Sequence, residues 1–227
     1  RSIKVFPATG ANSDSVAELA IGGIFVMFRK AYHEHAAVIA GEWPRMRMMG
    51  NEIMNRRLAI VGFGSIGKAL AWRAKGIGLK VNAFDPYVPA SDPRWAEYGV
   101  EKSESLIAAV KDADIVSIHT PLNDETRNMF DATVISAMRP GALLFNLARG
   151  GIVNEPDLIS ALKAGTIAGA FLDVLDKEPL PAGNAFAGVP NLLLTPHVGA
   201  RTREADDRVC NMIADAVLAE LKREPAA

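Results

Sequence analysis

An arginine follows a long apolar run in residues 144–153, LFNLARGGIV. The guanidinium of Arg149 stays charged at any ordinary pH, so a strand that ends on it must offer it an anion. Its planar fork matches a carboxylate in two hydrogen bonds. Gly150 and Gly151 follow directly and leave space for a small ligand. The segment therefore indicates a cleft that binds a small anionic substrate.

A glycine-rich segment, GFGSIG at residues 62–67, has the spacing G-x-G-x-x-G between a predicted strand and a predicted helix. Gly62 would permit the tight turn, Gly64 would let a pyrophosphate approach the backbone, and Gly67 would let the helix pack on the strand. The N-terminus of that helix presents free N–H groups to the phosphates. The pattern predicts a dinucleotide site, and a glycine turn that binds nothing is the alternative.

A second predicted strand, VNAFD, ends at Asp85. This carboxylate would accept hydrogen bonds from the ribose hydroxyls of the dinucleotide. Its negative charge would repel a 2′-phosphate, and no arginine adjoins it in the sequence. We therefore expect NAD, rather than NADP, as the cofactor.

A dinucleotide site suggests hydride transfer, and reduction of a carbonyl needs a proton donor that works near neutral pH, for which histidine is the natural choice. His33 and His35 lie two residues apart on a predicted helix, so they do not share a face, and no metal site is predicted. His119 and His197 each end a predicted strand. Ligands bind outside the carboxyl ends of strands in open parallel sheets. Both histidines therefore remain candidates from the residues alone.

A general-acid histidine is often oriented by a carboxylate, which also stabilises its protonated form. Asp173, Asp176 and Glu178 follow a predicted strand in AFLDVLDKEPL and so lie on the cleft side. The residues by themselves do not choose among these three, and a solvent-exposed loop position is the alternative for each.

The elements that must position these groups alternate along the chain. Apolar strands such as RLAIVG, DIVSIH and ALLFNL alternate with helical segments, which predicts a doubly wound parallel sheet of Rossmann type, covered on both faces. A short strand over residues 3–6, a helix over about 14–40 and a helix over about 203–223 flank it. We expect a hinge strand and interface helix in 1–50, the NAD-binding domain in 51–200, and a C-terminal hinge helix in 201–227.

Composition excludes several classes of partner. The 227 residues carry a formal net charge of -1, without the basic excess typical of nucleic-acid-binding proteins. The longest apolar stretch is too short to span a bilayer, so no membrane partner is expected. The single cysteine, Cys210, excludes an internal disulfide framework and favours a cytoplasmic location.

Several long segments resemble the D-isomer-specific 2-hydroxyacid dehydrogenases. The matching pieces are GANSDSVAE, GFGSIG, HTPLNDETRNMF, MRPGALLFNLARGGIVNEPDLISALKAG, IAGAFLDVLDKEPL and NLLLTPHVGARTREA. The resemblance implies that His197 is the acid/base, Glu178 its carboxylate partner and Arg149 the anchor of the substrate. It implies a 2-hydroxyacid or 2-keto acid as the substrate and a homodimer formed through the helix at 14–40.

The resemblance also implies a set of cofactor contacts, each carried over to a matching position. Besides the three glycines, the implied NAD-binding residues are Ser65 and Ile66 at the pyrophosphate, Asp85 at the ribose, Thr120 and Pro121 at the adenine, Leu147, Ala148 and Arg149 near the nicotinamide, Asp173 at its carboxamide, and His197, Gly199 and Ala200 beside it. Arg45 matches a position that contacts substrate in phosphoglycerate-type members.

Two features depart from the family pattern. Pro7 and Thr9 stand where members usually have an asparagine and a proline. No segment matches the flavodoxin-like substrate domain that precedes the NAD-binding domain and closes over the cofactor. We therefore expect this chain alone to bind NADH and to turn over poorly. A non-catalytic NAD-sensing module, similar to corepressors of this fold, and a phosphonate dehydrogenase are the alternative functions.

Overall fold

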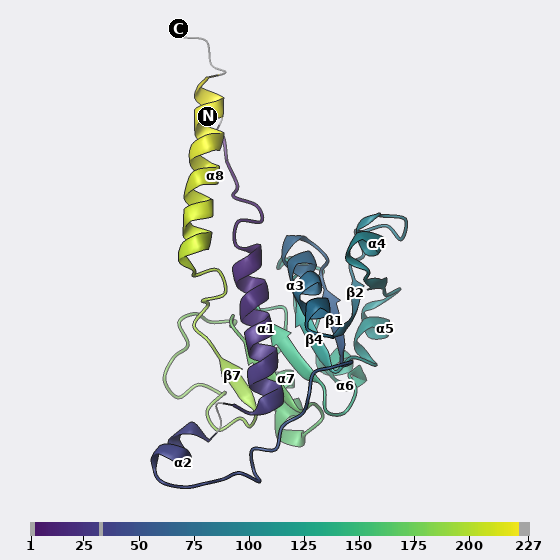
Figure 1. Cartoon of the computed structure of the whole chain (residues 1–227), viewed down its shortest axis with the longest axis vertical. Helices are drawn as coiled ribbons and strands as arrows, with labels where there is room; N and C mark the ends of the chain where they lie inside the picture. The colour runs from purple at the N-terminus through teal and green to yellow at the C-terminus, as the bar shows by residue number, and fades with distance from the viewer. Residues whose placement is uncertain (1–2, 32–33, 223–227) are drawn as a thin grey trace.

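A seven-stranded parallel sheet forms the centre of the computed structural model, which describes residues 3–31 and 34–222 (Figure 1). The strand order is β3-β2-β1-β4-β5-β6-β7, and every pairing is parallel. The strands are β1 (Arg57–Val61), β2 (Lys80–Phe84), β3 (Glu101–Lys102), β4 (Ile115–Ile118), β5 (Leu143–Asn146), β6 (Gly169–Leu172) and β7 (Leu192–Leu194). The prediction of a doubly wound, Rossmann-type sheet is confirmed.

Helices join the strands and extend the two ends of the chain. They are α1 (Ser13–Arg29), α2 (His35–Ile39), α3 (Ser65–Gly76), α4 (Arg94–Tyr98), α5 (Leu106–Val110), α6 (Ala132–Ala137), α7 (Glu155–Ala164) and α8 (Arg203–Leu221). Side-chain caps fix several of the starts: the Thr202 hydroxyl accepts from Ala205 N–H at the start of α8, and the Asn154 side chain accepts from Asp157 N–H at the start of α7.

The sheet has two apolar faces because alternate strand residues point to opposite sides. On β1, Leu58 and Ile60 pack in the core that contains α1 and α3, whereas Ala59 and Val61 pack in the core that contains α5, α6 and α7. Gly23 of α1 lies so close to the Phe171 ring that a Cβ there would be 2.5 Å from it. The helix α1 is therefore packed directly on the sheet.

Two predicted elements differ from the structure, and two short elements were not predicted. The single helix expected over 14–40 is interrupted after Arg29, because Lys30 adopts a left-handed conformation (φ 52°) and Ala31 N–H bonds back to the Val26 carbonyl. Residues 3–6 form no strand, although Lys4 contacts Glu220 of α8. The short elements α4 and β3 were not predicted, because so few residues carry no clear periodicity.

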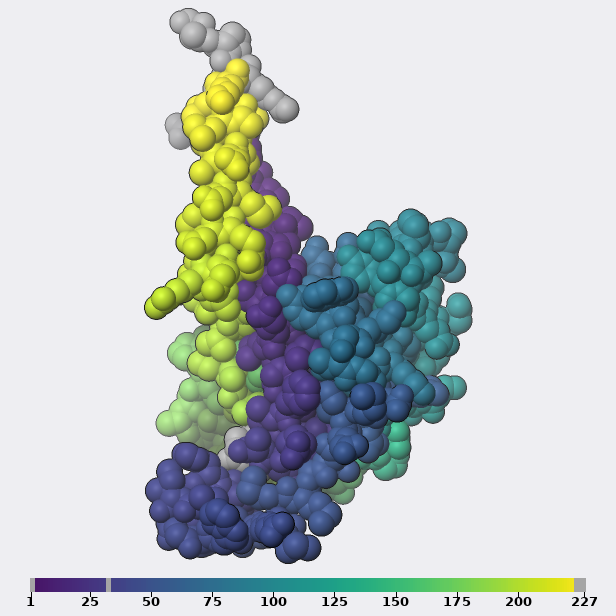
Figure 2. All heavy atoms as spheres, viewed as in Figure 1, coloured from purple at the N-terminus to yellow at the C-terminus, as the bar shows by residue number. Residues whose placement is uncertain are grey.

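The helix α8 projects from the body of the molecule, and the N-terminal segment runs beside it (Figures 1 and 2). Its base is tied to α1 by a 2.7 Å hydrogen bond between the hydroxyls of Ser15 and Thr202, and Arg208 donates to the Ala11 carbonyl at 2.7 Å. Ala205 is its one buried residue in the described part of the chain. No described helix combines the length and apolar character needed to cross a bilayer.

Candidate active site

The glycine segment forms a tight turn between β1 and α3. Gly62 has a φ of +95°, and a Cβ there would lie 2.7 Å from the His119 carbonyl oxygen. A Cβ on Gly67 would overlap the Gly62 carbonyl oxygen and approach the Ile60 side chain. By contrast, a Cβ on Gly64 would meet nothing within 4 Å. The open space thus lies at Gly64, directly at the N-terminus of α3, where a pyrophosphate fits.

Asp85 lies beside this turn at the end of β2. One carboxylate oxygen accepts from the Phe63 backbone N–H at 2.8 Å, and the other accepts from the Tyr87 N–H at 3.0 Å. The carboxylate is thereby fixed next to the glycine turn and keeps free lone pairs for ribose hydroxyls. Sequence reasoning missed Tyr87, whose hydroxyl bonds to Glu125, a contact that raises the pKa of Tyr87.

A histidine–carboxylate pair lies at the far side of the same sheet edge. His197 Nδ1 is 2.7 Å from Glu178 Oε2, and the Leu175 backbone N–H donates to Glu178 Oε1 at 2.9 Å. Burial would raise the pKa of Glu178, but the hydrogen bonds from Leu175 and His197 and the nearby charge of Arg149 together hold it below its ordinary value. Glu178 is therefore ionised near neutral pH and can stabilise a positive charge on the imidazole.

The other candidate histidine is enclosed. The His119 ring is buried, with Nε2 2.8 Å from the Ser117 hydroxyl and Nδ1 without a hydrogen-bond partner. This burial lowers its pKa to about 4. His119 is therefore neutral at pH 7 and faces no carboxylate, whereas the His197 ring is 44% exposed and faces Glu178.

Asp173 binds the segment that carries His197. Its side chain is 2% exposed and accepts from the N–H groups of Val198 at 2.8 Å and Gly199 at 2.7 Å, and from the Thr195 hydroxyl at 2.5 Å. A carboxylate can accept about four hydrogen bonds, so one position on Oδ2 is left for a cofactor amide. The predicted contact with the nicotinamide stays a prediction, and the contacts present here orient the turn that carries His197.

Arg149 follows β5 and its side chain is exposed at the carboxyl end of the sheet. The preceding residue, Ala148, is buried and accepts a 2.6 Å hydrogen bond from Arg149 Nη1. Asn146, which sequence reasoning did not select, shapes this turn: its side chain accepts from Ala148 N–H and donates to the Arg149 carbonyl. The charge of Arg149 lowers the pKa of Glu178, so the two side chains belong to one electrostatic site.

Several other predicted residues lie at the same edge. Ser65 begins α3, with Ile66 next to it; Leu147 is buried beyond β5; Ala200 follows Gly199. Thr120 follows β4 beside Gly62, with Pro121 next along the chain. The hydroxyl of Thr120 is buried and has no hydrogen-bond partner, which leaves a polar group free for a bound molecule. A pocket of about 570 Å³ opens beside the acid/base pair, between Glu178, Leu180, Leu194 and His197.

Arg45 is not brought to this site within the chain. It lies in the loop after α2, and this loop returns to the C-terminal end of α1 through the bond from Asn51 N–H to the Phe28 carbonyl. The site edge is tied instead to the N-terminal end of α1, through Ser15. With 17 residues in α1 and ~1.5 Å of rise per residue, the two ends are about 25 Å apart.

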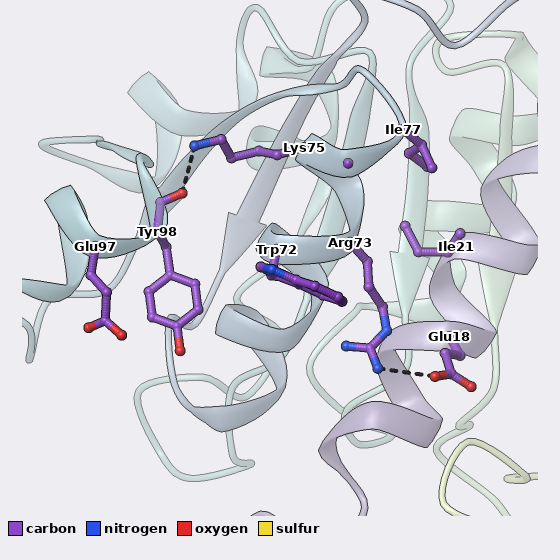
Figure 3. A pocket seen from close by; sticks show the side chains of 9 residues that line it. Glu18, Ile21, Trp72, Arg73, Lys75, Ile77, Glu97 and Tyr98 are labelled. Carbon is purple, nitrogen blue, oxygen red and sulfur yellow. Dashed lines mark hydrogen bonds and ion pairs between the residues drawn. The ribbon is translucent and has the colours of Figure 1, made fainter.

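His35 is exposed on α2, and His33 lies outside the described residues. No group of three potential metal-ligating side chains is assembled among residues 3–31 and 34–222. A hollow of about 810 Å³ lies between α1, α3 and α4, away from the cleft. Figure 3 shows Trp72 extended across it, between Tyr98 and Arg73. Its lining residues include no histidine.

Comparison with known proteins agrees with this geometry. The family model described as "D-isomer specific 2-hydroxyacid dehydrogenase, NAD binding domain" matches residues 21–199. The (S)-sulfolactate dehydrogenase of Chromohalobacter salexigens is 45% identical over 215 residues, which cover 95% of this chain and 69% of that protein. The D-3-phosphoglycerate dehydrogenase of Bacillus subtilis is 36% identical over 97% of this chain and 41% of its own length.

Solved structures give the same result. The NAD-dependent formate dehydrogenase of Staphylococcus aureus, solved in complex with NAD, superimposes with a TM-score of 0.85 at 30% identity, covering 99% of this chain and 67% of that one. The chain thus spans about two thirds of the length of some relatives and less than half of others.

Proposed function

The chain belongs to the D-isomer specific 2-hydroxyacid dehydrogenase family, as its NAD-binding domain, and we propose that it carries the catalytic groups of an NAD-dependent 2-hydroxyacid dehydrogenase. The observation that carries the proposal is the pair of His197 and ionised Glu178, 2.7 Å apart, with the charge of Arg149 beside them at the carboxyl edge of a Rossmann-type sheet. This arrangement provides an anion anchor and a proton donor in one cleft.

In the reducing direction, NADH held at the cofactor contacts would supply the hydride that reduces the keto carbon of the substrate. Arg149 binds the substrate carboxylate and polarises the adjacent carbonyl. His197 donates a proton from Nε2 to the carbonyl oxygen, since Nδ1 faces Glu178. Glu178 stabilises the imidazolium before transfer and keeps the ring oriented, and the reverse proton transfer serves oxidation.

We assign the cofactor contacts on the same basis. Gly64, Ser65 and Ile66 would hold the pyrophosphate and Asp85 the ribose, while Thr120 and Pro121 would line the adenine. Leu147 and Ala148 would contact the nicotinamide, Asp173 would hold its carboxamide, and Gly199 and Ala200 would complete the site beside His197. The open space at Gly64 and the unpartnered Thr120 hydroxyl support these assignments. Residues 51–200 would form the NAD-binding unit, with 1–50 and 201–227 as the flanking hinge segments.

The substrate is a small 2-hydroxy or 2-keto acid, tested by following NADH absorbance with glyoxylate, hydroxypyruvate and phosphohydroxypyruvate in the full-length enzyme. His197→Asn should lower kcat by about 10²–10⁴-fold, the usual contribution of a general acid, and leave the Kd for NADH nearly unchanged. His35→Asn, at an exposed position on α2, is the matched control. Unchanged turnover in His197→Asn would remove the assignment.

We further propose that two copies associate through the α1–α2 region. The large apolar side chains Ile39, Trp43 and Met46, at the end of α2 and in the loop after it, are more than 70% exposed. Such a concentration of exposed apolar surface is typical of an interface. Sedimentation at micromolar concentration should give a dimer, and Trp43→Ser should shift it toward monomer. A wild-type monomer would contradict this assembly.

The compartment is proposed as the cytoplasm. Cys210 is a free, exposed thiol, which suits a reducing environment.

A further inference from the structure

Two carboxylates that the proposed mechanism does not use lie between the loop that carries Arg149 and the loop that carries Glu178. The Gly151 backbone N–H, in the first loop, donates to Asp176 Oδ1 at 2.5 Å. The Asp176 backbone N–H, in the second loop, donates to Glu155 Oε1 at 2.7 Å. Glu155 is the first residue of α7, directly after the first loop. The second loop thus supplies a carboxylate to the backbone of the first, and the start of α7, which follows the first loop, supplies one to the backbone of the second.

The two loops are also in direct backbone contact. A Cβ on Gly150 would overlap the Leu175 carbonyl oxygen and lie 2.8 Å from the Asp176 nitrogen. On the other side of the same turn, the Leu175 N–H donates to Glu178, which in turn holds His197. A continuous path of contacts therefore leads from the backbone next to Arg149 to the acid/base pair.

Asp176 and Glu155 each accept a hydrogen bond from a backbone N–H group. Hydrogen bonds from N–H groups to ionised carboxylates are about twice as strong as neutral ones. Burial raises the pKa of Glu155, and the neighbouring charge of Asp176 raises it further, against the hydrogen bond from the Asp176 N–H. Two carboxylates placed side by side repel each other, so this tie is a poor device for stability alone. Its geometric effect is to fix the separation of the two loops.

We propose that Asp176 and Glu155 are positioning residues, which hold Arg149 at the distance from the Glu178–His197 pair that lets one small keto acid contact both. This inference rests on the proposed function. The glycines at 150 and 151 would otherwise leave the arginine loop free to move relative to the acid. A displacement of about 1 Å between reacting groups can cost on the order of 100-fold in rate.

The test compares Asp176→Ala with Asp176→Asn in the full-length enzyme. The asparagine keeps an oxygen that accepts from Gly151 N–H, whereas the alanine does not. Asp176→Ala should lower kcat for keto-acid reduction by about 10–100-fold, while Asp176→Asn should stay within about threefold of wild type. The Kd for NADH should stay unchanged in both, and the urea midpoint should change little, because the Asp176 side chain and its hydrogen bond to Gly151 are exposed to solvent. Asp112→Ala, an exposed aspartate near the amino ends of the strands, is the matched control.

A wild-type kcat in Asp176→Ala, or a loss explained by a lower urea midpoint, would overturn the inference and leave these carboxylates as stabilisers of α7. If Asp176→Ala unfolds, Glu155→Ala removes the other half of the tie and is judged by the same readouts. An inactive wild type would instead refute the proposed function. In that case, amide hydrogen exchange decides the tie: the Gly151 N–H should be protected in wild type and exchange faster in Asp176→Ala, and an unprotected Gly151 would refute it.

Discussion

Two alanine substitutions in the glycine segment should separate cofactor binding from folding. Gly64→Ala places a methyl group where nothing lies within 4 Å, and its φ of -79° suits alanine. Since alanine is a poorer N-cap than glycine, the free energy of unfolding should fall by no more than about 1 kcal/mol. The same methyl group occupies the space through which a pyrophosphate would reach the N-terminal N–H groups of α3. Losing one charge-assisted hydrogen bond costs about 1.5–3 kcal/mol, or about 10–150-fold in the Kd for NADH.

Gly67→Ala should give the opposite result. Its Cβ would overlap the carbonyl oxygen of Gly62, a backbone atom that cannot move aside without shifting β1 or α3. Overpacking of this kind costs about 1–3 kcal/mol, which outweighs the helix preference of alanine at this position. Urea unfolding measures the stability of both variants, and NADH fluorescence titration measures their affinity. Wild-type affinity in Gly64→Ala, or wild-type stability in Gly67→Ala, would refute the reasoning for that glycine.

Three further predictions concern charge. Glu178→Gln should lower kcat for reduction about fivefold, because the charge 2.7 Å from His197 Nδ1 is worth about 1 kcal/mol between two half-exposed side chains after solvent screening; an unaltered kcat would contradict this. Burial holds the pKa of His119 at about 4 in the folded protein, whereas in the unfolded chain it is near 6.5. As the pH falls from 6.5 to about 4, the unfolded chain binds a proton at His119 and the folded protein does not, so wild type should lose about 2–3 kcal/mol of stability. The free energy of unfolding of His119→Gln, measured in urea, should lack this loss. The same pH dependence of stability in wild type and His119→Gln would contradict the prediction. Asp85→Ser should reduce the preference for NADH over NADPH, measured as a ratio of Kd values, by about 5–10-fold, because it removes a like charge near the 2′-phosphate; an unchanged ratio would exclude that role.

Much of the fold could be predicted because it depends on local patterns. Apolar runs of strand length that alternate with helical segments require a covered parallel sheet. The polarity of such a sheet then brings the ends of all its strands, including Arg149 and His197, to one edge. The interruption of the first helix was not predictable in this way. Lys30 adopts a left-handed conformation without a glycine, and only the contact between Asn51 and the Phe28 carbonyl makes the reversal understandable.

The details of the site depended on distances that no pattern contains. Three carboxylates followed β6 in the sequence, and the fold gives them three different partners: Asp173 binds the backbone of 198 and 199, Asp176 binds Gly151, and Glu178 binds His197. For Arg45, the match in the sequence predicted a contact with the substrate, but the fold places this residue at the other end of α1 from the cleft.

The sequence by itself determined the sheet, the glycine turn and the edge at which chemistry occurs, because periodicity, glycine spacing and strand direction are properties of consecutive residues. The tertiary structure decided which histidine is exposed and paired with a carboxylate. His119 and His197 both end strands, but the packing around β4 encloses the first and lowers its pKa to about 4, while the turn held by Asp173 exposes the second to Glu178. Burial and pairing arise from residues distant in the chain, so only the folded molecule distinguishes the two.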